Sequence, residues 1–142
     1  MKHFPDLFVV GTDTGVGKTM IALLLMQLAF KQGRKPFYLK PFQTGCISVD
    51  DRDSDAKFIY AHTTQLAKKD PAQSVIYCHA NSKAPYFAAQ DKGQIIDLKY
   101  VQHVITQKRQ CFSPLIIEAA GGLLVPVTDN AMMIDVVGIS EV

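Results

Sequence analysis

Two stretches of the chain are apolar at consecutive positions rather than at alternating ones. They are residues 7–10 and residues 115–118, the second of which ends in Glu118. An uninterrupted apolar run fits a strand that is buried on both faces, as in a parallel sheet covered by helices. Residues 35–40 form a third candidate strand, which Pro41 is expected to close.

The segment that follows the first apolar run has a helical pattern. Residues 18–32 place four apolar side chains at positions i, i+3, i+4 and i+7, namely Ile21, Leu24, Leu25 and Leu28. This spacing predicts a helix with these side chains on one face, and such a face normally packs against the core. Gly33 is well placed to end the helix.

The remaining elements are also mostly helical. Four further helices are expected, at residues 54–68, 86–90, 98–105 and 130–137. Residues 69–93 are otherwise interpreted as connecting structure, although residues 75–77 are apolar. Strands that alternate with helices predict a doubly wound, mostly parallel α/β sheet flanked by helices, in one domain over residues 1–142. Because only three strands are evident, and so small a sheet leaves an edge exposed, we expect further strands beyond this sequence.

Composition and charge narrow the range of functions. Of the 142 residues, 48% are hydrophobic and 20% are charged, as in ordinary globular proteins. A net charge of +2 without basic runs argues against binding of nucleic acid or of a membrane surface. Three widely spaced cysteines without a C-x-x-C pair suit a reducing compartment. No signal peptide or bilayer-length apolar run is evident, so we expect a cytoplasmic protein.

A phosphate-binding loop is predicted between the first strand and the first helix. Residues 11–19 read Gly-Thr-Asp-Thr-Gly-Val-Gly-Lys-Thr. Glycines let backbone N–H groups approach phosphate oxygens, and the start of a helix adds further donors. Lys18 is expected to reach the β- and γ-phosphates, and the Thr19 hydroxyl to ligate Mg²⁺. The loop differs from the common pattern in having five residues, not four, between Gly11 and Gly17.

Charged side chains close two of the predicted strands. Lys40 ends the second strand and Glu118 ends the last one. Because ligands bind at the carboxyl ends of strands in open α/β sheets, both are expected in the crevice of the phosphate loop. Glu118 is favoured as a carboxylate that binds Mg²⁺ directly or through water. The alternatives are a solvated lysine and an acid that faces water. A second carboxylate is sought among Asp50, Asp51, Asp53 and Asp55, and spacing alone does not choose among them.

Four segments together resemble the dethiobiotin synthetase family. They are residues 11–19, Lys-Pro-Phe-Gln-Thr-Gly at 40–45, Ser-Asp-Ala at 54–56, and Glu-Ala-Ala-Gly-Gly-Leu-Leu-Val-Pro at 118–126. The resemblance runs along essentially the whole chain and includes the five-residue form of the phosphate loop. Two departures stand out. Ala119 occupies a position where the family usually has glycine, and family members continue beyond residue 142.

The resemblance implies an ATP- and Mg²⁺-dependent ligase that acts on diaminopelargonate and CO₂. A carbamate of the substrate is phosphorylated by ATP, and the second amine then closes a ureido ring. Lys18 and Lys40 are the implied catalytic residues, with Lys40 and Thr44 at the substrate, and a homodimer is expected. The implied Mg²⁺ ligands are Thr19, Asp55 and Glu118. The implied ATP-binding residues are Thr14, Gly15, Val16, Gly17, Lys18, Thr19, Met20, Asp55, Glu118, Ala119, Ala120 and Gly121.

Three other interpretations of the phosphate loop stay open. Switch-type ATPases that partition DNA or position proteins usually have a signature lysine five residues before the loop lysine, where this chain has Asp13. An amidating synthetase of the cobyrinate type needs a glutaminase domain with a nucleophilic cysteine, and none is evident. A non-catalytic nucleotide-binding remnant is favoured only by the absent C-terminal half.

Overall fold

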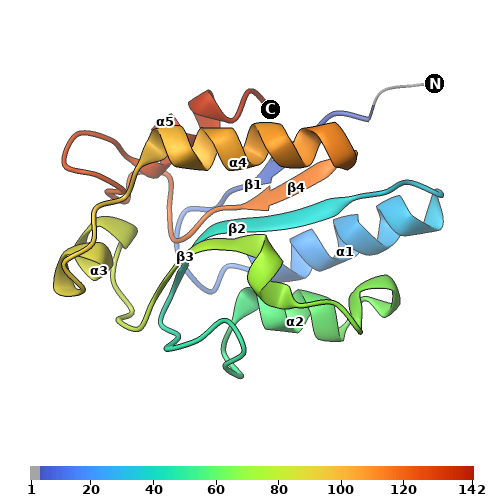
Figure 1. The fold of residues 1–142 in the computed structure, drawn as a ribbon, viewed down its shortest axis with the longest axis horizontal. Helices are drawn as coiled ribbons and strands as arrows, with labels where there is room; N and C mark the ends of the chain where they lie inside the picture. Colours follow the sequence, from blue (N-terminus) through green and yellow to red (C-terminus); the bar gives the residue numbers. More distant parts are fainter. Residues whose placement is uncertain (1–3) are drawn as a thin grey trace.

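A parallel sheet of four strands organises residues 4–142, the part of the chain described by this computed structural model (Figure 1). The strands are β1 (Leu7–Val9), β2 (Phe37–Thr44), β3 (Val75–His79) and β4 (Leu115–Glu118). Their order in the sheet is β1-β4-β2-β3, and every pairing is parallel. The predicted parallel α/β fold is confirmed, with β1 and β3 as the edge strands of the described residues.

Helices cover both faces of the sheet (Figure 1). The helices are α1 (Lys18–Lys31), α2 (Asp55–Ala61), α3 (Pro85–Asp91), α4 (Leu98–Cys111) and α5 (Met133–Ile139), with 3-10 turns η1 (Thr64–Leu66) and η2 (Pro71–Ser74). One buried cluster joins α1 and α2 to the sheet, and the other joins α4 and α5 to its opposite face. None of the helices in residues 4–142 is long and apolar enough to cross a membrane.

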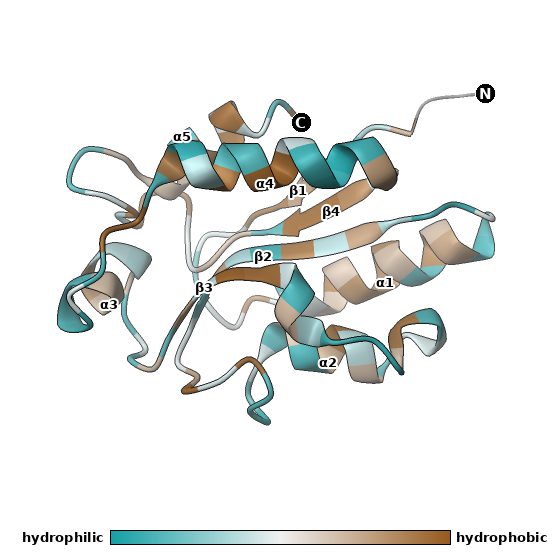
Figure 2. Cartoon of the chain, viewed as in Figure 1, coloured by the Kyte–Doolittle hydropathy of each residue, from teal (hydrophilic) through white to brown (hydrophobic). Residues whose placement is uncertain are grey.

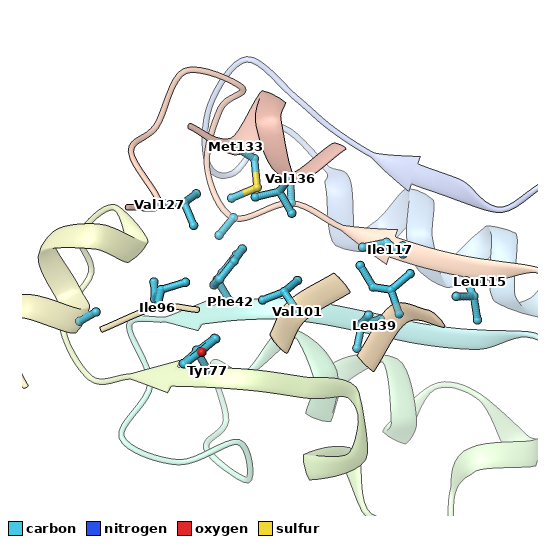
Figure 3. Close-up of a cluster of buried hydrophobic side chains, with 14 of the residues drawn as sticks. Leu39, Phe42, Tyr77, Ile96, Val101, Leu115, Ile117, Val127, Met133 and Val136 are labelled. Carbon is cyan, nitrogen blue, oxygen red and sulfur yellow. The ribbon is translucent and has the colours of Figure 1, made fainter. Parts of the chain in front are cut away.

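Alternation along the strands divides the core between the two faces. Leu39 and Ile117 belong to the cluster under α4, where they lie near Val101 (Figure 3). Their neighbours Tyr38 and Ile116 belong to the cluster under α1 and α2. Successive strand residues point to opposite faces, so a strand buried on both sides is apolar at every position. The consecutive apolar runs of the sequence therefore have the predicted cause, except at Val10, which lies beyond β1 and is 40% exposed.

Two strand predictions were wrong. β2 does not end at Pro41 but continues to Thr44. Its pairing with β4 ends at Leu39, and its pairing with β3 continues on both sides of the proline, so the absent N–H does not stop the strand. Residues 75–77, interpreted as connecting structure, belong to β3. This five-residue strand is too short to give a readable period.

The predicted helix at 54–68 is shorter than expected. Ser54 caps it, since its side chain accepts a hydrogen bond from the Lys57 N–H, but α2 ends at Ala61. Thr63 is extended, with φ −120° and ψ 108°, and a single 3-10 turn follows. The β-branched pair Thr63 and Thr64 disfavours continuation of the helix. In contrast, α4 extends beyond the predicted 98–105 to Cys111.

Of the four side chains on the apolar face predicted for the first helix, Leu25 packs against the core cluster under α1 and α2, but the other three do not. Ile21, Leu24 and Leu28 are 50%, 53% and 47% exposed. The buried face of α1 consists of Ala22, Leu23, Met26 and Ala29. Figure 2 shows apolar colouring along much of α1, in contrast to the strongly two-sided α4. Because α1 is apolar on more than one side, its periodicity does not identify the buried face, and the alanines allow close approach to the sheet.

Candidate functional site

The phosphate loop joins the carboxyl end of β1 to the start of α1. Gly15 and Gly17 have φ values of +70° and +105°, a region that favours glycine, and Gly17 caps α1. Lys18 is the first residue of α1 and is 8% exposed. Its Nζ donates to the Asp13 carbonyl oxygen at 2.5 Å, which closes the loop over the lysine side chain. The predicted strand–loop–helix arrangement is therefore present.

A second group of charges lies where the pairing of β2 with β4 ends. Glu118 is the last residue of β4, whereas Lys40, predicted to end its strand, lies within β2. The Lys40 Nζ lies 2.6 Å from Asp55 Oδ2 and 3.0 Å from Glu118 Oε1. It also donates to the carbonyl oxygen of Ala119 at 3.2 Å. The Thr19 hydroxyl donates to Glu118 Oε1 at 2.8 Å. We call Lys40, Asp55 and Glu118 the strand-end cluster. Its residues come from three distant parts of the sequence.

Burial and charge act in opposite directions on the two lysines. Burial lowers the pKa of Lys18, and the nearby positive charge of Lys40 lowers it further. Burial alone would also lower the pKa of Lys40, but the carboxylates of Glu118 and Asp55 outweigh it and leave the pKa raised. Lys40 is therefore held as a cation between two carboxylates, whereas Lys18 binds its proton less tightly than a free lysine.

The structure distinguishes among the four aspartates that follow β2. Asp55 is the one in contact with Lys40, and its backbone N–H donates to the Gln43 side chain at 3.1 Å. Asp51 instead accepts two backbone N–H bonds within its own loop. Asp50 lies 3.8 Å from exposed Lys57, and Asp53 lines the cavity described next.

A cavity of about 250 Å³ connects the phosphate loop with the strand-end cluster. Its lining residues are Thr14, Gly15, Gly17, Lys18, Thr19, Lys40, Gln43, Thr44, Asp53, Asp55, Glu118, Ala120 and Gly121. Three of the predicted ATP-binding residues do not line it. Val16 and Met20 are 54% and 50% exposed, and Ala119 is buried, although its carbonyl oxygen accepts from Lys40.

Sequence reasoning missed two residues of this site. Gln43 lines the cavity, as does Asp53, one of the four candidate aspartates. Gln43 lies within the Lys-Pro-Phe-Gln-Thr-Gly segment, which is the signal that singles it out. Tyr38 is 1% exposed and donates its hydroxyl to Glu118 Oε2 at 2.7 Å. Nothing in the sequence marks Tyr38, because tyrosine is ordinary in a buried strand.

Alanine at position 119 is compatible with this backbone. Among residues 4–142, the only non-glycine residue with positive φ is Glu141, so Ala119 is not in a conformation that requires glycine. Its backbone N–H donates to the Val9 carbonyl oxygen at 3.0 Å, and its methyl group belongs to the core cluster under α4 and α5. The departure from the family pattern therefore brings no backbone strain.

The oxygen donors of the site suit a hard divalent cation. Hydroxyl and carboxylate oxygens are the ligands that Mg²⁺ prefers, and Thr19, Asp55 and Glu118 supply them. The described residues contain no group of three or more His, Cys, Asp or Glu side chains that would hold a metal without further ligands. The two carboxylates already bind one cation, the Lys40 ammonium. Both carboxylates are therefore positioned to bind a cation.

The chain is similar in sequence to known proteins. Residues 5–142 match the model of a family described as an AAA domain. The chain is 36% identical over 121 residues to the ATP-dependent dethiobiotin synthetase BioD of Hydrogenobaculum sp. (strain Y04AAS1). The matched segment covers 85% of this chain and 52% of that protein. The same enzyme of Lysinibacillus sphaericus (strain C3-41) is 34% identical over 141 residues, or 96% of this chain and 58% of that protein.

The matches cover most of this chain but only part of each relative. A third relative, the ATP-dependent dethiobiotin synthetase BioD of Wolinella succinogenes, is 33% identical over 133 residues, or 91% of this chain and 60% of that protein. The chain thus spans little more than half the length of the curated relatives it matches. Because the family match covers all but four residues, the chain belongs to the AAA domain family, and the curated proteins that it resembles are ATP-dependent dethiobiotin synthetases.

Proposed function

We propose that this protein is an ATP- and Mg²⁺-dependent dethiobiotin synthetase, which carboxylates diaminopelargonate with CO₂ and closes the ureido ring. The observation that carries the proposal is the meeting of two buried lysines, Lys18 and Lys40, at one cavity. Relatives that carry this activity in their names support it. The homodimer implied by the resemblance and the cytoplasmic location expected from the sequence belong to the same proposal.

The phosphate loop binds the triphosphate. Its backbone N–H groups and the start of α1 offer donors to the phosphate oxygens. Lys18 leaves the Asp13 carbonyl oxygen, its partner in this structure, to neutralise the β- and γ-phosphates. This exchange replaces one hydrogen bond to a neutral oxygen by a stronger bond to an anion.

The strand-end cluster serves the second substrate. One amine of diaminopelargonate attacks CO₂ and loses a proton, which gives a carbamate. A carbamate oxygen then attacks the γ-phosphorus, and ADP leaves. The second amine attacks the carbamate carbon, phosphate leaves, and the ring closes. Lys40 stabilises negative charge on the carbamate and on the phosphoryl group in transfer, and the Thr44 hydroxyl, on the same cavity, holds the substrate.

Thr19, Asp55 and Glu118 would hold Mg²⁺, which neutralises charge on the β- and γ-phosphates when bound. These residues fit that role because their oxygens already surround a positive charge, with Glu118 Oε1 3.0 Å and Asp55 Oδ2 2.6 Å from the Lys40 ammonium. Lys40 would then be available to the carbamate.

Turnover by the purified protein tests the proposal. Phosphate release from ATP is measured with and without diaminopelargonate plus bicarbonate, and dethiobiotin is measured by mass spectrometry. Phosphate release that needs both substrates and equals dethiobiotin formed is the expected result. Phosphate release indifferent to both would contradict the proposal and favour a switch-type ATPase. ATP binding without turnover would indicate a non-catalytic nucleotide-binding protein.

A further inference from the structure

The carboxylate of Glu118 is held at both oxygens by different residues. Oε2 accepts a hydrogen bond from the Tyr38 hydroxyl at 2.7 Å. Oε1 accepts from the Thr19 hydroxyl at 2.8 Å and from the Lys40 ammonium at 3.0 Å. Tyr38 and Glu118 are each 1% exposed, so the bond between them is buried. The two oxygens of Glu118 therefore have different donors, Tyr38 at Oε2 and Thr19 with Lys40 at Oε1.

Strand register brings the tyrosine to the carboxylate. Tyr38 pairs with Ile116 across β2 and β4, so Glu118, two residues later, lies diagonally beyond it on the same face. Lys40, two residues after Tyr38, lies on that face as well. The Tyr38 ring belongs to the core cluster under α1 and α2, which fixes where its hydroxyl ends.

We infer that Tyr38 is a positioning residue for the metal-side carboxylate: by occupying Oε2, it leaves Oε1 alone to face the cavity. This inference rests on the proposed role of Glu118 toward Mg²⁺. Without the hydroxyl, Oε2 would be a buried carboxylate oxygen without its donor, which is unfavourable, and the carboxylate would turn to share its remaining partners. Hydrogen-bond partners that orient a metal ligand in this way affect metal affinity strongly.

A second tyrosine provides a matched control. Tyr60 is 5% exposed and belongs to the same core cluster as Tyr38. Its hydroxyl also has a buried partner, the Ser74 hydroxyl at 2.8 Å, and Ser74 in turn donates to the Tyr38 carbonyl oxygen at 2.6 Å. Tyr60→Phe therefore removes one buried hydroxyl near Tyr38 but takes no donor away from the Glu118 carboxylate.

The experiment compares Tyr38→Phe with Tyr60→Phe. Mn²⁺ binding is measured by electron paramagnetic resonance on protein saturated with a non-hydrolysable ATP analogue, and analogue binding without metal is measured by calorimetry. We expect Tyr38→Phe to weaken Mn²⁺ binding about tenfold or more, without change in metal-free analogue binding. Tyr60→Phe should leave Mn²⁺ binding unchanged although both variants lose thermal stability.

A double mutant tests whether Tyr38 affects Mn²⁺ binding through the Glu118 carboxylate. In a Glu118→Gln background, Tyr38→Phe should weaken Mn²⁺ binding no further, because the group it positions is gone. Equal Mn²⁺ affinity in Tyr38→Phe and Tyr60→Phe, or a wild-type protein that binds no Mn²⁺ with nucleotide, would overturn the inference. Failure of the proposed function is seen separately, as an absence of dethiobiotin from wild-type protein that still binds nucleotide and Mn²⁺.

Discussion

The phosphate loop and the strand-end cluster share one cavity but are built in opposite ways. Residues 12–17 of the loop are exposed, whereas Lys40 and Glu118 are 4% and 1% exposed. The loop offers backbone donors of the kind that phosphate oxygens accept. In the strand-end cluster each charge is already matched by another within the protein.

Because of this difference, we expect the phosphate loop to govern nucleotide binding and the strand-end cluster to govern turnover. A ligand at the loop gains bonds to donors that face solvent, so changes there should alter nucleotide affinity. A ligand at the cluster must compete with internal ion pairs, and breaking one member of a buried pair leaves the other uncompensated. Changes in the cluster should therefore affect turnover and stability more than nucleotide affinity. The following predictions test this division, from the largest expected effect to the smallest.

Removal of the buried lysine should have the largest effect. We expect Lys40→Ala to lower kcat by about 10²–10³-fold while ATP affinity changes by no more than about threefold. It should also lower thermal stability, because Asp55 and Glu118 lose their shared cation. Steady-state kinetics and calorimetry measure these quantities, and exposed Lys57 gives the control Lys57→Ala. A large loss of ATP affinity with an unchanged kcat would contradict the assignment of turnover to the strand-end cluster.

A methyl group at Gly122 should disturb the contact between the two regions. A Cβ there would lie 2.6 Å from the Thr12 carbonyl oxygen in the phosphate loop. We expect Gly122→Ala to lower the free energy of unfolding by about 1–3 kcal/mol and to weaken ATP binding, as seen by urea denaturation and calorimetry. Gly138→Ala is the control, since nothing lies within 4 Å of its added Cβ. An unchanged free energy of unfolding in Gly122→Ala would show that the phosphate loop shifts to make room for the methyl group without loss of stability.

The Thr19 hydroxyl links the loop to the cluster through its bond to Glu118. Thr19→Ala should weaken nucleotide binding about tenfold in the presence of Mg²⁺ but leave metal-free binding unchanged. Titration of a fluorescent ATP analogue with and without EDTA measures both. Thr106→Ala, on the exposed face of α4, provides the control. Equal loss with and without Mg²⁺ would assign Thr19 to packing instead.

The smallest effect concerns pH. The pKa of Lys18 is lowered in the free protein, so Lys18 loses its proton at a lower pH than a free lysine. Bound phosphates favour the charged form, so ATP affinity should fall as pH rises through this lowered pKa. Calorimetry from about pH 8 to about pH 10 should show the decline in wild-type protein and not in Lys18→Met. The same decline in both proteins would assign it to another group.

Features that depend on adjacent residues were predicted from the sequence. The phosphate loop, with its strand before and helix after, is local, because glycine conformations and a helix start are set by neighbours along the chain. Lys40 and Glu118 were placed at one crevice because parallel strands bring their carboxyl ends to the same edge of a sheet. The doubly wound topology follows from alternation of strands and helices.

Features that depend on contacts between distant segments required the structure. The choice of Asp55 among four aspartates is made by a lysine from β2, and the bond from Tyr38 to Glu118 by the register of β2 against β4. The buried face of α1 was predicted wrongly, because its side chains are apolar on several sides and only the sheet selects among them. The sequence by itself determined which chemical groups are present and that Lys40 and Glu118 meet at one crevice. Tertiary packing decided which groups touch, because distance and burial are properties of the folded chain and not of its spacing.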